Sequence, residues 1–476
     1  MPKAGCVSLS RPTAENPRMQ DSVIKEIAAV VGSAHILTTP EDCWTYAYDA
    51  TDRAHMPEAV VFPGSAAEIS EILKLANQYR FPVTPRGAGT GRSGGSVPVA
   101  GGVVLVLTRL NRILEINRQD LVAVVEPGVI TGRLQRAVAE QGLYYPPDPS
   151  SADFCTIGGN VAECAGGAVA VQYGVTRDYV LGLTVVLPTG EIINAGTRTM
   201  KGVVGYDLTR LFLGSEGTLG VITRIILRLV GKPAARQTLA AGFRTMEAAA
   251  EAVSAILAGG LAPTALEFMD RVTLECVGEM LPFAIPAATA ALLLVAVDGH
   301  PRDVEARAGR IAQFCREHGA RPVLRAKTPE EAEGLWKARK VVSPALLKVK
   351  PQKVSEDVVV PLGAIPRLIA GLQEVSRRRG LLVPCYGHAG DGNIHVNVLY
   401  DRGVDRERDA VGGAVEDIFR LVRELEGTLS GEHGIGLTKA PYLGMELSPA
   451  AMALQRRIKQ AFDPNNIMNP GKIFPE

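Results

Sequence analysis

Residues 85–95 read Pro85-Arg86-Gly87-Ala88-Gly89-Thr90-Gly91-Arg92-Ser93-Gly94-Gly95 and follow a short predicted strand at 82–84. Glycines let successive backbone N–H groups converge on an anion, and their missing side chains permit close approach. The loop therefore predicts a diphosphate site, with a plain structural turn as the alternative. A nicotinamide-binding Rossmann loop is disfavoured, because Arg92 takes the third glycine position of G-x-G-x-x-G and the chain continues through Pro98 into a predicted strand at 103–107.

The composition is that of an ordinary globular chain long enough for two or more domains. It has 476 residues, 46% hydrophobic and 21% charged, and a net charge of +1, which gives no broad field for nucleic acid or an anionic membrane. The seven cysteines contain no C-x-x-C, which indicates isolated thiols and no iron–sulfur cluster. We expect residues 1–20 to be disordered. With no apolar signal core and no apolar run long enough to span a bilayer, we expect a cytoplasmic chain with no transmembrane segment.

Hydrophobic periodicity predicts an α+β fold in two parts that meet near Lys232-Pro233. The first part begins with helices at 23–31 and 65–76 and closes with a strand at 221–229. In the second part, strands alternate with helices, which indicates one sheet covered by helices. The expected strands are 238–243, 292–297 and 354–360, and the expected helices are 246–257, 303–318, 330–347 and 364–379. Residues 402–408 are interpreted as a mixed-charge surface loop, and a last helix is expected at 449–462.

Further glycine-rich segments follow the first loop at characteristic spacing. They are Pro146-Pro147-Asp148-Pro149-Ser150-Ser151 with Thr156-Ile157-Gly158-Gly159-Asn160, Tyr173-Gly174 with Arg177-Asp178, and Gly214-Ser215-Glu216-Gly217-Thr218-Leu219-Gly220-Val221-Ile222. Together they resemble the FAD-binding domain of the vanillyl-alcohol oxidase / p-cresol methylhydroxylase (PCMH) superfamily. The branch resembled is that of the FAD-linked oxidases, which contains the glycolate oxidase D-subunit, D-lactate dehydrogenase and D-2-hydroxyglutarate dehydrogenase. The resemblance runs from about residue 59 to residue 474.

The resemblance implies a PCMH-type FAD-binding domain of two subdomains at 56–231, after an N-terminal segment at 1–55. An α+β cap domain for substrate would follow at 232–425, and a C-terminal segment at 426–476 would return to the flavin. Noncovalent FAD is expected, because Ser93, Gly94, Gly95 and Ser96 occupy the stretch where some members attach flavin through histidine. The flavin-binding residues it implies are Pro85, Arg86, Gly87, Ala88, Gly89, Thr90, Gly91, Ser150, Ser151, Ala152, Asp153, Phe154, Cys155, Thr156, Gly158, Gly159, Cys164, Ala165, Gly166, Gly167, Glu216, Gly217, Gly220, Val221, Ile222 and Asn469.

Histidines and carboxylates gather in two other glycine-bounded loops. His388 and His395 are separated by Asp391-Gly392-Asn393, a turn that can bring both rings to one end of a strand pair, and Glu432 precedes His433 in the second loop. Two imidazoles and a carboxylate suit Zn²⁺, Mn²⁺ or Fe²⁺ with positions left open for a ligand, although histidines that merely cap turns are the alternative. Metal-binding relatives use the matching positions, which favours His388, His395 and Glu432 as ligands. Asp391 is a candidate second partner of these ligands.

Substrate contacts are implied by the same resemblance on the cap. Arg339, Ser343 and Lys353 match the family's anchoring Arg, hydroxyl and Lys, and an Arg fork suits a carboxylate. The alternative for Arg339 is a solvated basic helix face. Asn397, two residues beyond His395 on one strand face, is a further candidate.

These residues suggest a mechanism. Substrate carboxylate and hydroxyl would chelate the metal, His433 would take the hydroxyl proton, and the Cα hydride would pass to flavin N5. The expected reaction is oxidation of a small D-2-hydroxy acid, D-lactate or glycolate, to the 2-oxo acid. D-2-hydroxyglutarate dehydrogenase and an FAD-dependent ether-lipid (alkylglycerone phosphate) synthase are the alternatives.

The chain carries no cluster motif, so its electrons must leave to an external acceptor. An iron–sulfur subunit, an electron-transferring flavoprotein or a quinone is expected in that role, with peripheral attachment to the inner membrane through a partner and a homodimer as further expectations. A non-catalytic flavin subunit is disfavoured, because it would not need the Glu432-His433 pair.

Overall fold

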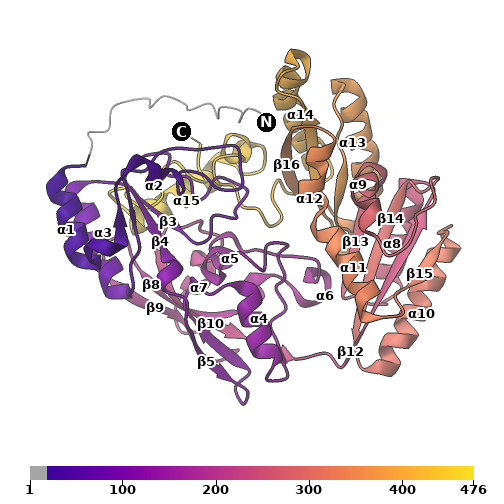
Figure 1. The fold of residues 1–476 in the computed structure, drawn as a ribbon, viewed down its shortest axis with the longest axis horizontal. Coiled ribbons are helices and arrows are strands. Elements are labelled where there is room, and N and C mark those ends of the chain that lie inside the picture. Colours follow the sequence, from indigo (N-terminus) through magenta and orange to yellow (C-terminus); the bar gives the residue numbers. More distant parts are fainter. Residues whose placement is uncertain (1–18, 476) are drawn as a thin grey trace.

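The computed structural model describes residues 19–475, and the expected disorder of residues 1–18 lies outside this range (Figure 1). A first four-stranded sheet has the order β1-β2-β4-β3, in which β2, β4 and β3 are parallel. Its core is packed by α1 and α3, which bury the apolar stripes that their periodicity predicted. The bounds are β1 Ile36–Leu37, β2 Ala59–Val61, β3 Val83–Arg86, β4 Val103–Val106, α1 Asp21–Val31, α2 Pro40–Trp44 and α3 Ala66–Tyr79.

A second, five-stranded antiparallel sheet has the order β5-β6-β10-β8-β9. Short helices connect its strands, and β7 pairs separately with β11. The bounds are β5 Ile113–Asn117, β6 Val122–Val125, β7 Leu143–Tyr144, β8 Val180–Val186, β9 Ile192–Gly196, β10 Val221–Arg228, β11 Val230–Gly231, α4 Thr131–Ala139, α5 Ile157–Glu163, α6 Ala170–Tyr173 and α7 Leu208–Phe212.

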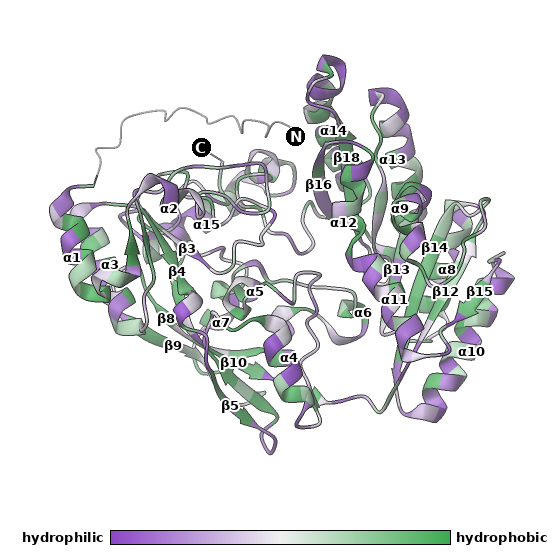
Figure 2. Ribbon diagram, viewed as in Figure 1, coloured by the Kyte–Doolittle hydropathy of each residue, from purple (hydrophilic) through white to green (hydrophobic). Residues whose placement is uncertain are grey.

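The cap holds a seven-stranded antiparallel sheet of order β15-β12-β14-β13-β17-β18-β16. Alternate strand residues face two cores, so helices α8, α10, α13 and α14 cover one face and α9, α11 and α12 the other. Figure 2 shows green, apolar strands beneath helices whose outer faces are purple. The bounds are β12 Ala235–Phe243, β13 Ala265–Asp270, β14 Ala291–Gly299, β15 Val323–Arg325, β16 Gln352–Val359, β17 Cys385–His388, β18 Asn393–Tyr400, α8 Met246–Ala258, α9 Arg271–Val277, α10 Pro301–Glu317, α11 Pro329–Lys340, α12 Val342–Ala345, α13 Ile365–Arg379 and α14 Asp405–Glu424.

The C-terminal segment leaves the cap and returns to the first sheet, where it is drawn in yellow in Figure 1. Helix α15, Pro449–Phe462, packs Phe462 against the core of the five-stranded sheet. Beyond it, the Val83 N–H donates to the Ile467 carbonyl and the Asn469 N–H donates to the Val83 carbonyl, so the tail runs beside β3. The end of the chain is therefore part of the wall that carries the glycine-rich loop.

The predicted α+β class is confirmed, and two local predictions need correction. The surface loop expected at 402–408 is wrong beyond Val404, because the 20-residue α14 begins at Asp405; its charged first turns hide an apolar face that starts only near Ala414. The single helix expected at 330–347 is interrupted at Val341. Strand β13 was not predicted. No described helix combines the length and apolar character that crossing a bilayer requires.

Candidate functional site

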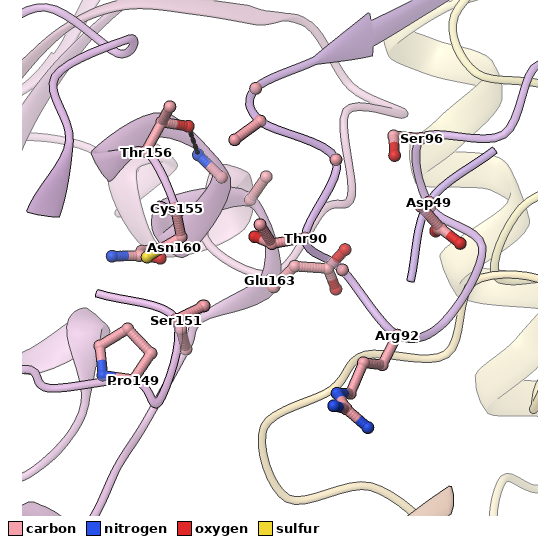
Figure 3. A pocket seen from close by; sticks show the side chains of 18 of the residues that line it. Asp49, Thr90, Arg92, Ser96, Pro149, Ser151, Cys155, Thr156, Asn160 and Glu163 are labelled. Atoms are coloured by element: carbon pink, nitrogen blue, oxygen red, sulfur yellow. Dashed lines mark hydrogen bonds between the residues drawn. The ribbon is translucent and has the colours of Figure 1, made fainter. Parts of the chain in front are cut away.

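A cavity of about 490 Å³ lies between the FAD-binding side of the molecule and the cap (Figure 3). This size is within the range of small-molecule sites. One wall consists of the 85–96 loop, the 149–165 segment and residues 215–222. The other wall comes from α11, α12, β16, β17, β18 and the 432–433 loop. Segments distant in sequence thus meet in one space, which makes it the candidate active site.

The glycine-rich loop leaves β3 and packs tightly against its surroundings. A Cβ at Gly87 would lie 2.3 Å from Thr156 Oγ1, and a Cβ at Gly89, where φ is +70°, would lie 2.1 Å from Arg86 Nη2. The Arg86 side chain is buried and donates to the Tyr48 carbonyl at 2.7 Å. An anion at this loop would therefore meet backbone N–H groups, while the Arg86 guanidinium packs against Gly89 and donates to the Tyr48 carbonyl.

Most residues that the sequence assigned to flavin line this cavity, but some do not. Phe154 is 71% exposed, Asp153 lies 3.5 Å from Arg136 on the surface, and the Asn469 side chain donates to the carbonyls of Gly95 and Glu216. Asn469 thus links the loop that contains Gly95 to the loop that contains Glu216, behind the cavity wall. The assigned residues outside the lining are Ala152, Asp153, Phe154, Cys164, Gly166, Gly167 and Asn469.

Two buried carboxylates on the flavin side were not anticipated as a pair. Burial and the neighbouring Glu216 raise the pKa of Glu163 well above its usual range, and Glu163 Oε2 has no hydrogen-bond partner. Burial also raises the pKa of Glu216 to about 7, although Glu216 accepts hydrogen bonds from the N–H groups of Ile435 and Gly436. Both carboxyl groups therefore hold a proton more readily than an ordinary glutamate, which reduces the negative charge on this wall.

The three predicted metal ligands converge on the opposite wall. One donor atom each from His388, His395 and Glu432 lies within 4.8 Å of the others, and both histidine Nε2 atoms are 3.5 Å from Glu432 Oε1. The turn at Asp391-Gly392-Asn393 joins β17 to β18, as the sequence suggested. Nitrogen and carboxylate donors at this separation fit a divalent transition-metal ion.

The carboxylate that supports His388 is Glu267 and not Asp391. Glu267 lies directly opposite His388 in the β13–β17 pair, and its Oε1 is 2.6 Å from His388 Nδ1. Asp391 instead accepts from the Asn393 N–H at 3.2 Å. Glu267 is fully buried, and its other oxygen, Oε2, accepts from Arg339 Nε at 2.6 Å. One carboxylate therefore neutralises Arg339 and orients His388 together.

The two histidines have opposite electrostatic environments. Burial alone would lower the pKa of His388, but Glu267 and Glu432 raise it well above its ordinary value. Burial and the charges of His388 and His433 lower the pKa of His395. His388 is thus faced by two carboxylates while His395 offers a free lone pair, an arrangement suited to a bound cation.

His433 is held by a buried aspartate that the sequence had not indicated. His433 Nδ1 lies 3.3 Å from Asp357 Oδ1, and Asp357 Oδ2 accepts from the N–H groups of Gly431, Glu432 and His433. The buried Lys439 ammonium donates to Asp357 Oδ1. Burial alone would raise the pKa of Asp357, but His433 and Lys439 lower it to about 2. Asp357 therefore fixes the loop and the ring as an anion.

The ring of His433 remains suited to accept a proton. Burial lowers the pKa of His433 below the ordinary histidine value, although Asp357 and Glu432 oppose this. The ring stacks on His395 with centroids 5.4 Å apart and planes 14° apart. With Nδ1 facing Asp357, the neutral ring has Nε2 as its available acceptor.

The predicted substrate contacts are brought together only in part. Arg339 and Ser343 line the cavity, whereas Lys353 reaches it through hydrogen bonds to Ser343. Asn397 is fully buried behind the wall, where its carbonyl oxygen accepts from the Ser355 hydroxyl at 2.7 Å. Ser355 and Tyr386 line the cavity in its place. The guanidinium carbon of Arg339 lies over the Tyr386 ring, 4.7 Å from the ring centroid.

Comparisons with known proteins agree with this architecture. Residues 57–196 match the family model "FAD binding domain", and residues 232–473 match "FAD linked oxidases, C-terminal domain". The chain is 44% identical over 430 residues to glycolate oxidase subunit GlcD of Bacillus subtilis, covering 90% of this chain and 92% of that one. It is 37% identical over 425 residues to a D-lactate dehydrogenase of Anaerostipes hadrus, covering 88% and 89%. The fold matches p-cresol methylhydroxylase with a TM-score of 0.81 at 18% identity, covering 95% and 96%.

Proposed function

Since the chain belongs to the FAD-linked oxidases, we propose that it oxidises a small D-2-hydroxy acid, D-lactate or glycolate, to the corresponding 2-oxo acid. One observation carries this proposal: the glycine-rich wall and a cluster of metal-type and basic side chains lie on opposite sides of one cavity. The cluster consists of His388, His395, Glu432 and His433. A redox cofactor site and a base beside a metal-type site are the two parts that oxidation of a 2-hydroxy acid needs.

FAD fits the wall formed by the 85–91 loop and the 150–159 segment. Close glycine packing leaves backbone N–H groups for the diphosphate, and the raised pKa of Glu163 reduces charge repulsion. Bound FAD supplies the acceptor for the hydride that leaves the substrate carbon. Acid or heat should release free FAD, because no histidine follows the loop; flavin that stays with the precipitated chain would contradict noncovalent binding.

His388, His395 and Glu432 would hold a divalent ion, Zn²⁺, Mn²⁺ or Fe²⁺. Such an ion supplies Lewis acidity that makes a hydroxyl easier to deprotonate. This assignment is supported by the two carboxylates, Glu267 and Glu432, that face His388 from either side of its ring. Glu267 holds the His388 ring in position, so the ligand set is fixed before any ion binds.

His433 would take the proton from the substrate hydroxyl. Its pKa is lowered below the ordinary histidine value, which favours the neutral ring, and the approach of Nδ1 to 3.3 Å from Asp357 Oδ1 would leave Nε2 as the accepting atom. The imidazolium that forms is stabilised by the adjacent Asp357 anion. Arg339, Ser343 and Lys353 would bind the substrate carboxylate through charged and hydroxyl donors, and Asn397 would act by positioning Ser355.

Electrons must then leave to a partner. The proposed acceptor is an iron–sulfur subunit or an electron-transferring flavoprotein, which agrees with the word "subunit" in the name of the Bacillus subtilis relative. A quinone is the alternative. We further propose a cytoplasmic location, attachment to the inner membrane only through the partner, and a homodimer.

An ether-lipid synthase is the competing function, because that enzyme shares the superfamily fold. It would carry out no net oxidation. The buried His388, His395 and Glu432 cluster favours the dehydrogenase, since it places metal-type ligands beside a base.

The test is anaerobic mixing of the FAD-loaded protein with D-lactate, L-lactate, glycolate and D-2-hydroxyglutarate. We expect D-lactate or glycolate to bleach the flavin and L-lactate to do so far less. If none of these acids bleaches the flavin, the proposal is refuted.

A further inference from the structure

Arg92 crosses from the flavin side of the cavity to the cap. It follows the glycine-rich loop directly, and Figure 3 shows it across the cavity from Thr156 and Asn160. Its Nη2 donates to Ser343 Oγ of α12 at 3.0 Å. Arg92 therefore lies on the substrate side of the cavity although it belongs to the FAD-binding domain.

Lys353, from β16, approaches the same hydroxyl. Its ammonium donates to both the Oγ and the carbonyl of Ser343. Two cations therefore converge on one neutral side chain from two domains. A single hydroxyl oxygen cannot balance two positive charges, so the arrangement lacks an anion.

On the cap wall, Arg339 and Lys340 also line the cavity and both have acidic partners, whereas Arg86 on the opposite wall donates to the Tyr48 carbonyl. Arg339 Nη2 lies 2.5 Å from Glu267 Oε2, and Lys340 Nζ lies 3.7 Å from Asp148. Among residues 19–475, no Asp or Glu oxygen lies within 4.0 Å of the Arg92 guanidinium or the Lys353 ammonium. Burial, and to a lesser extent the charge of Arg92, lowers the pKa of Lys353 to about 7.

We propose that Arg92 is a substrate-binding residue that, with Lys353, forms a two-cation clamp for the carboxylate of the hydroxy acid. This inference rests on the proposed function for the identity of the substrate. An incoming carboxylate would take the place of the missing anion, accept hydrogen bonds from both cations and remain beside the Ser343 hydroxyl. The alternative is that Arg92 only braces the two domains through Ser343.

The experiment uses FAD-loaded protein and propionate, a carboxylate that has no hydroxyl to oxidise. Calorimetry should show propionate binding to the wild type and binding weaker by about 10- to 150-fold in Arg92→Met, the range for a lost charged hydrogen bond. Arg92→Lys should recover part of the affinity, because it retains the charge. Lys340→Met, which removes a cation already paired with Asp148, should bind propionate like the wild type.

The pH dependence tests whether the Lys353 ammonium binds the carboxylate. Wild-type affinity for propionate should fall as pH rises past about 7, because Lys353 loses its proton. In Arg92→Met this fall should move to higher pH, since the neighbouring charge that lowers the pKa of Lys353 is gone. This movement follows from the lost charge alone, so the affinity measured at one pH is what distinguishes the clamp from a brace.

Equal propionate affinity in wild type and Arg92→Met, at unchanged FAD content, would overturn the clamp. A wild-type affinity that does not fall as pH rises past about 7 would overturn it as well, since Lys353 would then not bind the carboxylate. Neither result depends on turnover, so the bleaching experiment with hydroxy acids still judges the proposed function independently. If only the bleaching experiment fails, Arg92 and Lys353 still form a carboxylate site, in an oxidase that acts on another substrate.

Discussion

The two walls of the cavity bind by different means. The flavin wall presents glycine backbone and Glu163, whose pKa is raised well above its usual range, with the buried Arg86 guanidinium turned towards the Tyr48 carbonyl. The cap wall presents ionised side chains held in pairs, Glu267 with Arg339 and Asp357 with Lys439. The difference implies that close backbone packing holds the cofactor, while charged side chains carry out the reaction. Damage to one wall should therefore leave the function of the other measurable.

The largest difference between the effects on the two walls is expected from His433→Gln. The glutamine keeps a polar group of similar reach but cannot act as the base, and a positioned base contributes about 10²–10⁴-fold in rate. Flavin reduction by the hydroxy acid should slow by at least about 10²-fold in rapid-mixing measurements, while FAD and metal content stay unchanged. The exposed His300→Gln is the matched control and should behave like wild type. Equal rates in His433→Gln and wild type would remove His433 from the role of base.

Glu267→Gln should produce a smaller effect on the same wall. The amide can still contact His388 but no longer carries the charge that raises the pKa of that histidine. Loss of a supporting carboxylate weakens metal binding by about 10- to 100-fold. Metal content after dialysis measures this change, and exposed Glu279→Gln is its control. FAD should remain bound; loss of FAD from Glu267→Gln would show that the walls are not independent.

Gly87→Ala should act on the flavin wall alone and by the smallest amount. Its new Cβ would lie 2.3 Å from the Thr156 hydroxyl, which can move in part, so we expect a cost of about 1 kcal/mol, or roughly 5-fold weaker FAD binding. Fluorescence of released FAD during dilution measures it. Gly363→Ala, which meets no atom within 4 Å, is the control. An effect of Gly87→Ala on metal content would contradict the separation.

The residues of the two walls could not be predicted equally well from the sequence. The glycine-rich loop and the His388, His395 turn are local patterns, so their residues could be named before the fold was known. Glu267 and Asp357 could not, because their roles depend on strand register: Glu267 lies opposite His388 and Asp357 opposite His395. The available signal was a lone carboxylate within an apolar strand, as in Leu266-Glu267-Phe268.

Arg92 and α14 show two other limits. Arg92 was visible as the residue that breaks the dinucleotide-binding pattern, but its contact with Ser343 crosses 251 positions of sequence and depends on domain packing. Helix α14 was missed because mixed charges fill its first turns, and only the buried Val415, Ile418 and Phe419 reveal its apolar face. Tertiary packing therefore decided both features.

One measurement tests the separation of the two walls most directly: a comparison of flavin reduction in metal-loaded and chelator-treated protein. The chelated protein should keep its FAD and be reduced at once by dithionite, yet it should not be bleached by the hydroxy acid that bleaches the loaded form. This result would place the cofactor on one wall and the hydroxy-acid chemistry on the other. Rapid bleaching by the hydroxy acid in demonstrably metal-free protein would contradict the account.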